Sequence, residues 1–306
     1  MGAGHSHSHG TATGQHRNRL LTVLAITLTV MVVQVVGGIA SGSLALLADA
    51  GHMLTDAAGV GLALLATWFA ARPATLERTF GYQRAEILAA VINALLLLGV
   101  AAYVLVEAVR RFSSPSEVAP GLMLTVAVVG LAANAVSLYL LHHGQSESLN
   151  VRGAYLEVLG DLLGSVAVIV AAAVIWLTGF TRADAIASVL IGLMILPRTW
   201  GLLRDAVDVL LEAAPKNVDL TPVRDHILNI PGVVDVHDLH AWTITSGVPV
   251  LSAHVVVDDV VLAEGCNGGA VLDKLGECLA GHFDVEHCTF QLESASHRDH
   301  EAAYHL

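Results

Sequence analysis

Two long apolar stretches of this sequence carry ionisable side chains at matched spacing. The stretches are residues 46–66 and 154–177, and each holds a pair of metal-ligand residue types four positions apart: His52 and Asp56 in the first, Glu157 and Asp161 in the second. In an α-helix this spacing stacks the two side chains on one face, about one turn apart. Two such faces would offer one imidazole and three carboxylates, enough to enclose a divalent cation.

A purely structural role is the alternative for these side chains. A polar group in hydrocarbon is costly and normally faces other helices or a water-filled cavity. A single carboxylate could be hydrogen-bonded within a helix bundle, but three converging carboxylates would repel one another without a cation or bound protons. The pattern therefore favours a metal site. Asp49, three positions before His52, extends the same face and is interpreted either as a group that supports the ligands or as an acid on the exit pathway.

The composition is typical of a polytopic membrane protein. Of the 306 residues, 55% are hydrophobic and only 14% are charged, and the mean hydropathy is +0.66. The net charge of −12 excludes a nucleic-acid-binding surface. The first residues contain no apolar core of a cleavable signal peptide. All three cysteines (Cys266, Cys278 and Cys288) lie in the last fifth of the chain without a disulfide-like pattern, which indicates a reducing, cytosolic setting.

Six segments are apolar and long enough to cross a bilayer, which takes about 20 helical residues. They are residues 19–40, 44–70, 86–109, 120–142, 154–177 and 183–204. Arginines near the ends of these segments indicate the orientation, because cytosolic loops carry the excess of positive charge. The excess predicts that both chain termini are cytosolic, although the Arg110–Arg111 pair falls on the other side.

The character of the sequence changes after residue 205. Residues 206–295 contain helical and β-rich runs in the order α-β-β-α-β, which predicts a small cytosolic α+β domain of the ferredoxin-like type. The predicted fold class is therefore an all-α six-helix membrane bundle over 18–205, followed by this domain. Residues 1–17 include HSHSHG and are expected to form a disordered tail that binds metal loosely or has no essential role. Residues 296–306 are expected to be a frayed end.

Four motifs carry a resemblance to a known family. They are SGSLALLADAGHMLTDAAG, FGYQRAEILAAVINALLLL, YLEVLGDLLGS and VHDLHAWTI. Together they resemble the cation diffusion facilitator family, the zinc-type transporters of bacteria and eukaryotic organelles, over nearly the whole chain. The resemblance implies a homodimer, here expected in a bacterial plasma membrane, that exports divalent metal from the cytosol in exchange for protons. It maps the transport site onto the second and fifth helices, at His52, Asp56, Glu157 and Asp161.

One ligand position departs from the family pattern. The fifth-helix pair of zinc members usually begins with His, and here it begins with Glu157. Zinc accepts both imidazole and carboxylate ligands, whereas additional oxygen donors favour harder ions such as Mn²⁺. Zinc remains the first expectation because His52 and the second-helix motif are of the zinc type, with manganese, cobalt and cadmium as alternatives. Because ligands must lose their protons to bind metal, metal and protons would compete for the same side chains, which describes an antiporter.

The cytosolic domain is rich in histidine. The resemblance places regulatory metal ligands, with zinc as the expected ion, at positions matching His237, His254 and His287. His240, Cys266 and Asp258 are additional candidates, and ordinary surface histidines without a ligand role are the alternative.

The relation between His237 and His254 depends on the hairpin that joins their strands. A turn centred on Thr245–Ser246 would place the two histidines directly opposite each other, and one centred on Ser246–Gly247 would leave them diagonal but on one face. A one-residue slip would separate the faces.

A charged pair is also implied by the resemblance. At the positions of Arg84 and Glu212, family members carry opposite charges that lock the membrane and cytosolic parts together.

Two functions of other classes are less well supported. An intramembrane metalloenzyme lacks an HExxH motif here, and four protein ligands leave no open position on a tetrahedral ion. A metal sensor would need an output domain, and none follows residue 295. The sequence thus predicts a transporter rather than an enzyme.

Overall fold

The computed structural model describes residues 17–142, 149–216, 218–245, 247–262, 268–283, 285, 287–298 and 300. The His-rich run of the expected N-terminal tail, Cys266 and residues 301–306 lie outside these ranges. The chain divides into two compact units, one formed by Met1–Leu62 with Ile92–Leu202 and the other by Ala63–Val91 with Leu203–Leu306. Each unit has its own hydrophobic core.

All six predicted membrane spans are confirmed as helices. They are α2 (Arg17–Ser41), α3 (Leu44–Ala70), α4 (Ala85–Ser113), α5 (Pro120–His142), α6 (Leu149–Thr178) and α7 (Arg182–Leu210). In the described part of the chain these six are long and apolar enough to cross a membrane. Helix α7 continues through Pro197 and runs on to Leu210, beyond the predicted end of the sixth span.

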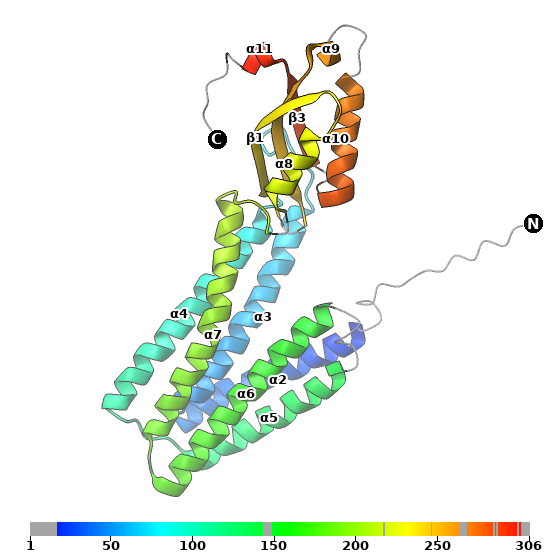
Figure 1. Cartoon of the computed structure of the whole chain (residues 1–306). Coiled ribbons are helices and arrows are strands. Elements are labelled where there is room, and N and C mark those ends of the chain that lie inside the picture. The colour runs from blue at the N-terminus through cyan, green and yellow to red at the C-terminus, as the bar shows by residue number, and fades with distance from the viewer. Residues whose placement is uncertain are drawn as a thin grey trace, which may run out of the picture. The chain divides into compact units, whose positions relative to one another are not determined.

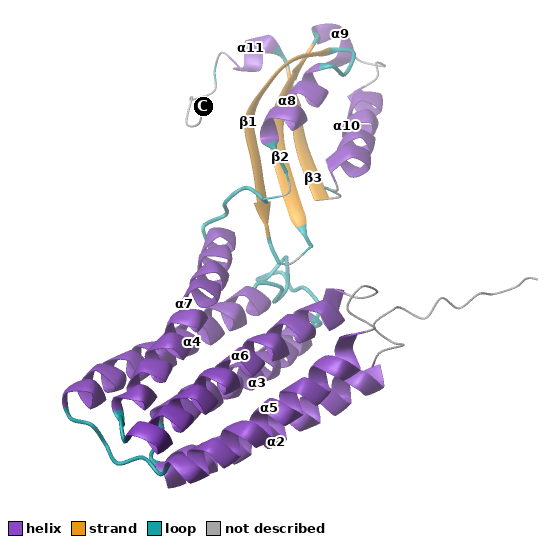
Figure 2. Ribbon diagram, turned by 60° about the horizontal axis from the view of Figure 1, so that its bottom comes forward, coloured by secondary structure: helices purple, strands orange, loops and turns teal. Residues whose placement is uncertain are grey.

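The first unit is packed through small side chains. Helix α5 lies between α2 and α6 and contacts both (Figure 2). Many residues of the core are alanines, such as Ala45, Ala48 and Ala127, all fully buried. Small residues let helices approach closely in a bilayer, where van der Waals packing and not the hydrophobic effect drives association. Helices α2, α5 and α6 therefore form a closely packed group.

A buried carboxylate fixes the start of α3. Asp184 accepts hydrogen bonds from Ser43 Oγ at 2.6 Å and from the backbone N–H of Leu44 at 2.8 Å. These are N-terminal donors that have no partner inside the helix. Arg111 donates to the carbonyl oxygen of Gly42 at 2.6 Å, where the chain turns with a φ of +71°. The first turn of α3 is thus anchored, and Asp49 and His52 follow within two turns.

The second unit contains the predicted α-β-β-α-β order. Helix α8 (Leu220–Leu228) precedes strands β1 (Val233–Thr243) and β2 (Pro249–Val257), and α10 (Gly268–Phe283) precedes β3 (His287–Glu293). The sheet order is β1-β2-β3, with β1 and β2 antiparallel and β2 and β3 parallel. Helices α8 and α10 cover one face of the sheet (Figure 1). Two short helices, α9 (Asp259–Leu262) and α11 (Ala295–Arg298), were not expected; α11 begins at the predicted frayed end.

Candidate metal sites

The two membrane ligand pairs lie where the helical spacing predicted. His52 and Asp56 share a face of α3, with 3.4 Å between Nε2 and Oδ2. Glu157 and Asp161 lie on α6, and His52 and Glu157 line one cavity. Converging carboxylates repel one another unless a proton or a cation lies between them. The structure therefore brings the α3 pair against the α6 pair.

Two ligand atoms in this group are buried without a partner. Asp161 is 3% exposed. Within the residues that the structure describes, Asp161 Oδ1 and His52 Nδ1 are buried and make no hydrogen bond. Buried polar atoms are nearly always paired, and unpaired ones need an explanation such as an ion or water. A cation or a proton at this site would supply the missing partner.

A cavity of about 170 Å³ opens beside the ligands. Asp49, His52, Glu157 and Arg198 provide its charged or ionisable lining. Gly164 also lines it, and a Cβ atom at that position would lie 2.7 Å from Asp49 Oδ1. Glycine is thus what allows the Asp49 carboxylate to reach the cavity.

Asp49 is held by a residue that the sequence did not indicate. Gln34, on α2, donates from Nε2 to Asp49 Oδ2 at 2.6 Å, and both side chains are buried. A polar side chain inside an apolar helix is a signal for such a contact, but helical spacing cannot name its partner on another helix. Asp49 therefore lines the cavity while Gln34 fixes its orientation.

The four membrane ligands are not closed into a cage in this conformation. Among the described residues, the group whose ligand atoms all lie within 4.8 Å of one another is a different one, in the second unit. Metal binding between α3 and α6 would require a further approach of these side chains.

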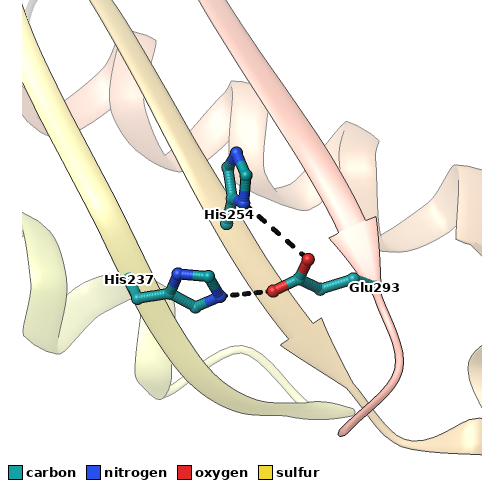
Figure 3. A group of neighbouring side chains, drawn as sticks. All are labelled: His237, His254 and Glu293. Atoms are coloured by element: carbon teal, nitrogen blue, oxygen red, sulfur yellow. Dashed lines mark hydrogen bonds and ion pairs between the residues drawn. The ribbon is translucent and has the colours of Figure 1, made fainter. Parts of the chain in front are cut away.

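That second group consists of His237, His254 and Glu293 (Figure 3). His237 Nε2 contacts Glu293 Oε1, and His254 Nδ1 lies 3.7 Å from Glu293 Oε2. The three residues come from β1, β2 and β3. Their neighbours Val236, Ala253 and Leu292 pack in the core beneath α8 and α10. Because side chains alternate along a strand, the three ligand residues lie on the other face of the sheet.

A β-bulge places His237 opposite His254. Near the turn, Thr243 pairs with Pro249 and His240 with Ser252. Continued without change, that register would put His237 opposite Val255, one residue out of step. The register shifts between His237 and His240 instead, where Asp238 has a φ of +47°. Neither regular hairpin register applies along the whole of β1, and the bulge restores the direct pairing.

The structure does not bring the other predicted cytosolic ligands to this group. His287 begins β3 and Glu293 ends it, so the two are separated by roughly 20 Å at about 3.3 Å per residue. His287 instead contacts the ring of Phe80, with 5.8 Å between centroids. His240 pairs with Ser252 beyond the bulge, and Asp258 follows the end of β2. The third member of the group, Glu293, was missed by sequence reasoning.

The predicted charged pair is formed. Arg84 Nη2 lies 2.9 Å from Glu212 Oε1, and both side chains are substantially exposed. Glu212 follows α7 with a φ of +58°, in the left-handed conformation where glycine is usual at a helix end. Its own N–H bonds Val209 O, and the next N–H, of Ala213, bonds Asp208 O. A charged residue is thus kept at a position whose backbone favours glycine.

Comparison with known proteins assigns the chain to a family. Residues 20–211 match the family described as "Cation efflux transmembrane domain", and residues 215–295 match "Cation efflux protein, cytoplasmic domain". The "Metal cation efflux system protein CzcD" of Cupriavidus metallidurans is 50% identical over 306 residues, which cover 100% of this chain and 95% of that protein. The "Zinc transporter ZitB" of Escherichia coli is 46% identical over 276 residues, covering 90% and 86%.

A third relative carries a broader name. The "Cadmium, cobalt and zinc/H(+)-K(+) antiporter" of Bacillus velezensis is 41% identical over 269 residues, which cover 87% of this chain and 85% of that protein. Both family domains, in order and over nearly the whole length, agree with the six helices and the small α+β unit. The chain belongs to the cation efflux family, the cation diffusion facilitators, and is an integral membrane transporter of metal cations and not an enzyme.

Proposed function

We propose that this protein exports Zn²⁺ from the cytosol in exchange for protons, by alternating between two conformations. The transport ligands are His52, Asp56, Glu157 and Asp161. The observation that carries the proposal is the approach of the α3 and α6 ligand pairs beside a cavity, with Asp161 Oδ1 and His52 Nδ1 buried and unpaired among the described residues. The open arrangement supports a site that assembles around its ion and releases it again.

Zinc fits this donor set. Imidazole and carboxylate oxygen are both common zinc ligands, and four protein ligands complete a tetrahedral site. One relative is named a zinc transporter, and another is named for cadmium, cobalt and zinc. Cadmium, cobalt and manganese are the competing ions, and manganese gains from the three carboxylates.

Proton exchange follows from ligand chemistry. A ligand binds metal only in its deprotonated form, so an arriving metal ion expels protons and arriving protons expel the metal. When the site is empty, protons between Asp56 and Glu157 would relieve their repulsion. The name of the Bacillus velezensis relative also includes proton antiport.

The second unit is proposed to sense metal and to hold a homodimer together. His237, His254 and Glu293 would bind a regulatory Zn²⁺, with Glu293 in place of the expected His287. The family domain over residues 215–295 supports the homodimer. The ion pair of Arg84 and Glu212, both in the second unit, would tie the segment before α4 to the end of α7. The bacterial relatives support a plasma-membrane location, and we place both termini in the cytosol.

Flux measurements in liposomes test the transport site. Asp56→Asn and Asp161→Asn should each abolish Zn²⁺ uptake into liposomes that contain a zinc dye, because each removes a charged ligand without changing the side-chain volume. Asp208→Asn is the control, since Asp208 lies on α7 in a surface pair with Arg204. Size-exclusion chromatography would check that each variant is folded and dimeric. Normal flux in both ligand variants would disprove the site.

Coupling needs a separate measurement. Two results together would indicate exchange. Zn²⁺ should enter the liposomes when their interior is more acidic than the medium, and the interior should become more alkaline only when zinc is present. If Zn²⁺ flux does not depend on the pH gradient, the protein is still a transporter, but the proposed antiport mechanism is wrong. A series with Zn²⁺, Cd²⁺, Co²⁺ and Mn²⁺ in the same liposomes would rank the ions.

A further inference from the structure

We propose that Arg198 is a tethered cation that competes with the transported metal for Glu157 and so sets the affinity of the membrane site. This inference rests on the proposed transport ligands. Arg198 Nη2 lies 4.0 Å from Glu157 Oε2, and Arg198 lines the same cavity as His52 and Asp49. The guanidinium group therefore lies beside a carboxylate that we propose as a ligand of the incoming cation.

Arg198 brings a guanidinium group to the lining of the cavity. Guanidinium stays protonated at all physiological pH values, unlike the other ionisable groups of the cavity. A dication that approaches Glu157 must therefore either displace this charge or bind in its field. Removing one positive charge several ångströms from a bound dication should favour the bound state markedly, even in a high effective dielectric.

The contact has the features of a reversible occupant. Its 4.0 Å separation is longer than a hydrogen bond, and the Arg198 side chain is 63% exposed. A long, largely exposed arginine side chain can move its guanidinium group toward water while its aliphatic part stays in place. Pro197 lies inside α7 directly before it and removes one backbone hydrogen bond of the helix. Arg198 can thus leave Glu157 without breaking a buried network.

Arg198 also offsets part of the negative charge of the proposed site. Glu157 is one of three carboxylates among the four proposed ligands. An anionic ligand adds a negative charge to the empty site, and Arg198 lies against that carboxylate. The pair therefore combines a stronger ligand for metal with a built-in competitor for it.

Orientation in the membrane is the simpler explanation for an arginine near the end of a span. Arg204 provides the comparison, because it lies on the same helix, is 72% exposed and pairs with Asp208 at the same distance of 4.0 Å. Arg204 is absent from the lining of the cavity that Arg198 shares with Glu157. The two arginines differ in what they face, so Arg204→Gln is a matched control.

The test is Zn²⁺ affinity of the full-length protein, measured by competition with a zinc dye. All variants carry His254→Ala and Glu293→Gln, so that the second-unit group does not contribute. Arg198→Gln and Arg198→Met should each bind Zn²⁺ about tenfold more tightly than the background protein. Arg198→Lys and Arg204→Gln should stay near the background affinity. Flux should show a lower KM and a lower maximal rate for the two neutral variants, because tighter binding slows release.

A double-mutant cycle completes the test. The effect of Arg198→Gln should shrink when Glu157→Gln is also present, since the competitor then has no carboxylate to hold. Unchanged or weaker binding in both neutral variants would overturn the role of Arg198, provided that Asp161→Asn still abolishes binding. If Asp161→Asn leaves zinc affinity unaltered, the transport site itself is refuted. The two failures are therefore distinguishable.

Discussion

At the scale of single residues, Glu157 decides the net charge of the proposed transport site. With a bound dication, three carboxylates and an imidazole leave one net negative charge, whereas the His of the family pattern would leave the site neutral. Arg198 lies against Glu157. The Glu157 side chain therefore affects both the preference of the site for one metal over another and the proposed competition with Arg198.

Replacing Glu157 by His should raise the preference for Zn²⁺ over Mn²⁺. The variant gives two imidazoles and two carboxylates, and imidazole suits zinc better than the harder manganese ion. The measurement is relative Zn²⁺ and Mn²⁺ flux in liposomes at several pH values. The pH dependence should also change, because the empty site of the variant has fewer carboxylates that need protons. Glu157→Gln serves as the control, since it removes the charge without adding an imidazole. An unchanged ion ranking in Glu157→His would show that Glu157 does not contact the metal.

The sequence was sufficient to place each proposed ligand pair on one face of a helix, but it did not indicate the surroundings of the pairs. Four-residue spacing is a local property of a helix, so His52 with Asp56 and Glu157 with Asp161 follow from the sequence alone. Gln34 and Arg198 come from α2 and α7, and their approach depends on how helices pack. Such contacts leave no spacing signal in a single sequence.

At the scale of elements, the bulge in β1 determines which face of the sheet carries His237. A register shift of one residue exchanges the two faces of a strand. Asp238 supports the bulge in the left-handed region, which Gly, Asn and Asp adopt at low cost and β-branched residues do not. The candidate metal group of the second unit therefore depends on a residue that is not among its proposed ligands.

Asp238→Val should weaken zinc binding to this group, whereas Asp238→Gly should retain it. Valine in the left-handed region costs about 1–3 kcal/mol, and removal of the bulge would turn His237 toward α8 and α10. Bound zinc and the zinc-induced shift in Tm are measured in full-length protein that carries Asp56→Asn and Asp161→Asn. Thr243→Val controls for an added valine at a regular position of β1. Equal zinc binding in the Gly and Val variants would argue against this role of the bulge.

The order of elements in the second unit was predictable, and its third ligand was not. Runs of β-rich and helical sequence gave α-β-β-α-β, and alternation puts His287 and Glu293 on one face of β3. Which end of β3 meets the histidines is set by its parallel register with β2, where Gln291 pairs with His254. That register is a long-range property. Glu293 is buried at the end of its strand, which the sequence alone does not show.

At the scale of the whole molecule, the chain carries two candidate metal sites of different construction. The membrane ligands are helical pairs that are open in this conformation, and the second-unit ligands already lie within 4.8 Å of one another. A preassembled site loses less conformational freedom on binding than one that must close. We therefore expect cytosolic zinc to fill the second-unit group first and transport to respond to its occupancy.

His254→Ala and Glu293→Gln should each raise the zinc concentration for half-maximal flux, while flux at saturating zinc stays near wild type. Bound metal stabilises the conformation that binds it, by mass action. A variant whose regulatory site stays empty lacks this stabilisation. His287→Ala is the decisive comparison, because His287 lies at the opposite end of β3 from Glu293 and contacts Phe80. It should leave the half-maximal concentration unchanged if the ligands are His237, His254 and Glu293. If His287→Ala shifts the half-maximal zinc concentration as much as His254→Ala does, His287 belongs to the ligand set, as the family resemblance implies. If all three variants show normal zinc dependence, this site has no regulatory role.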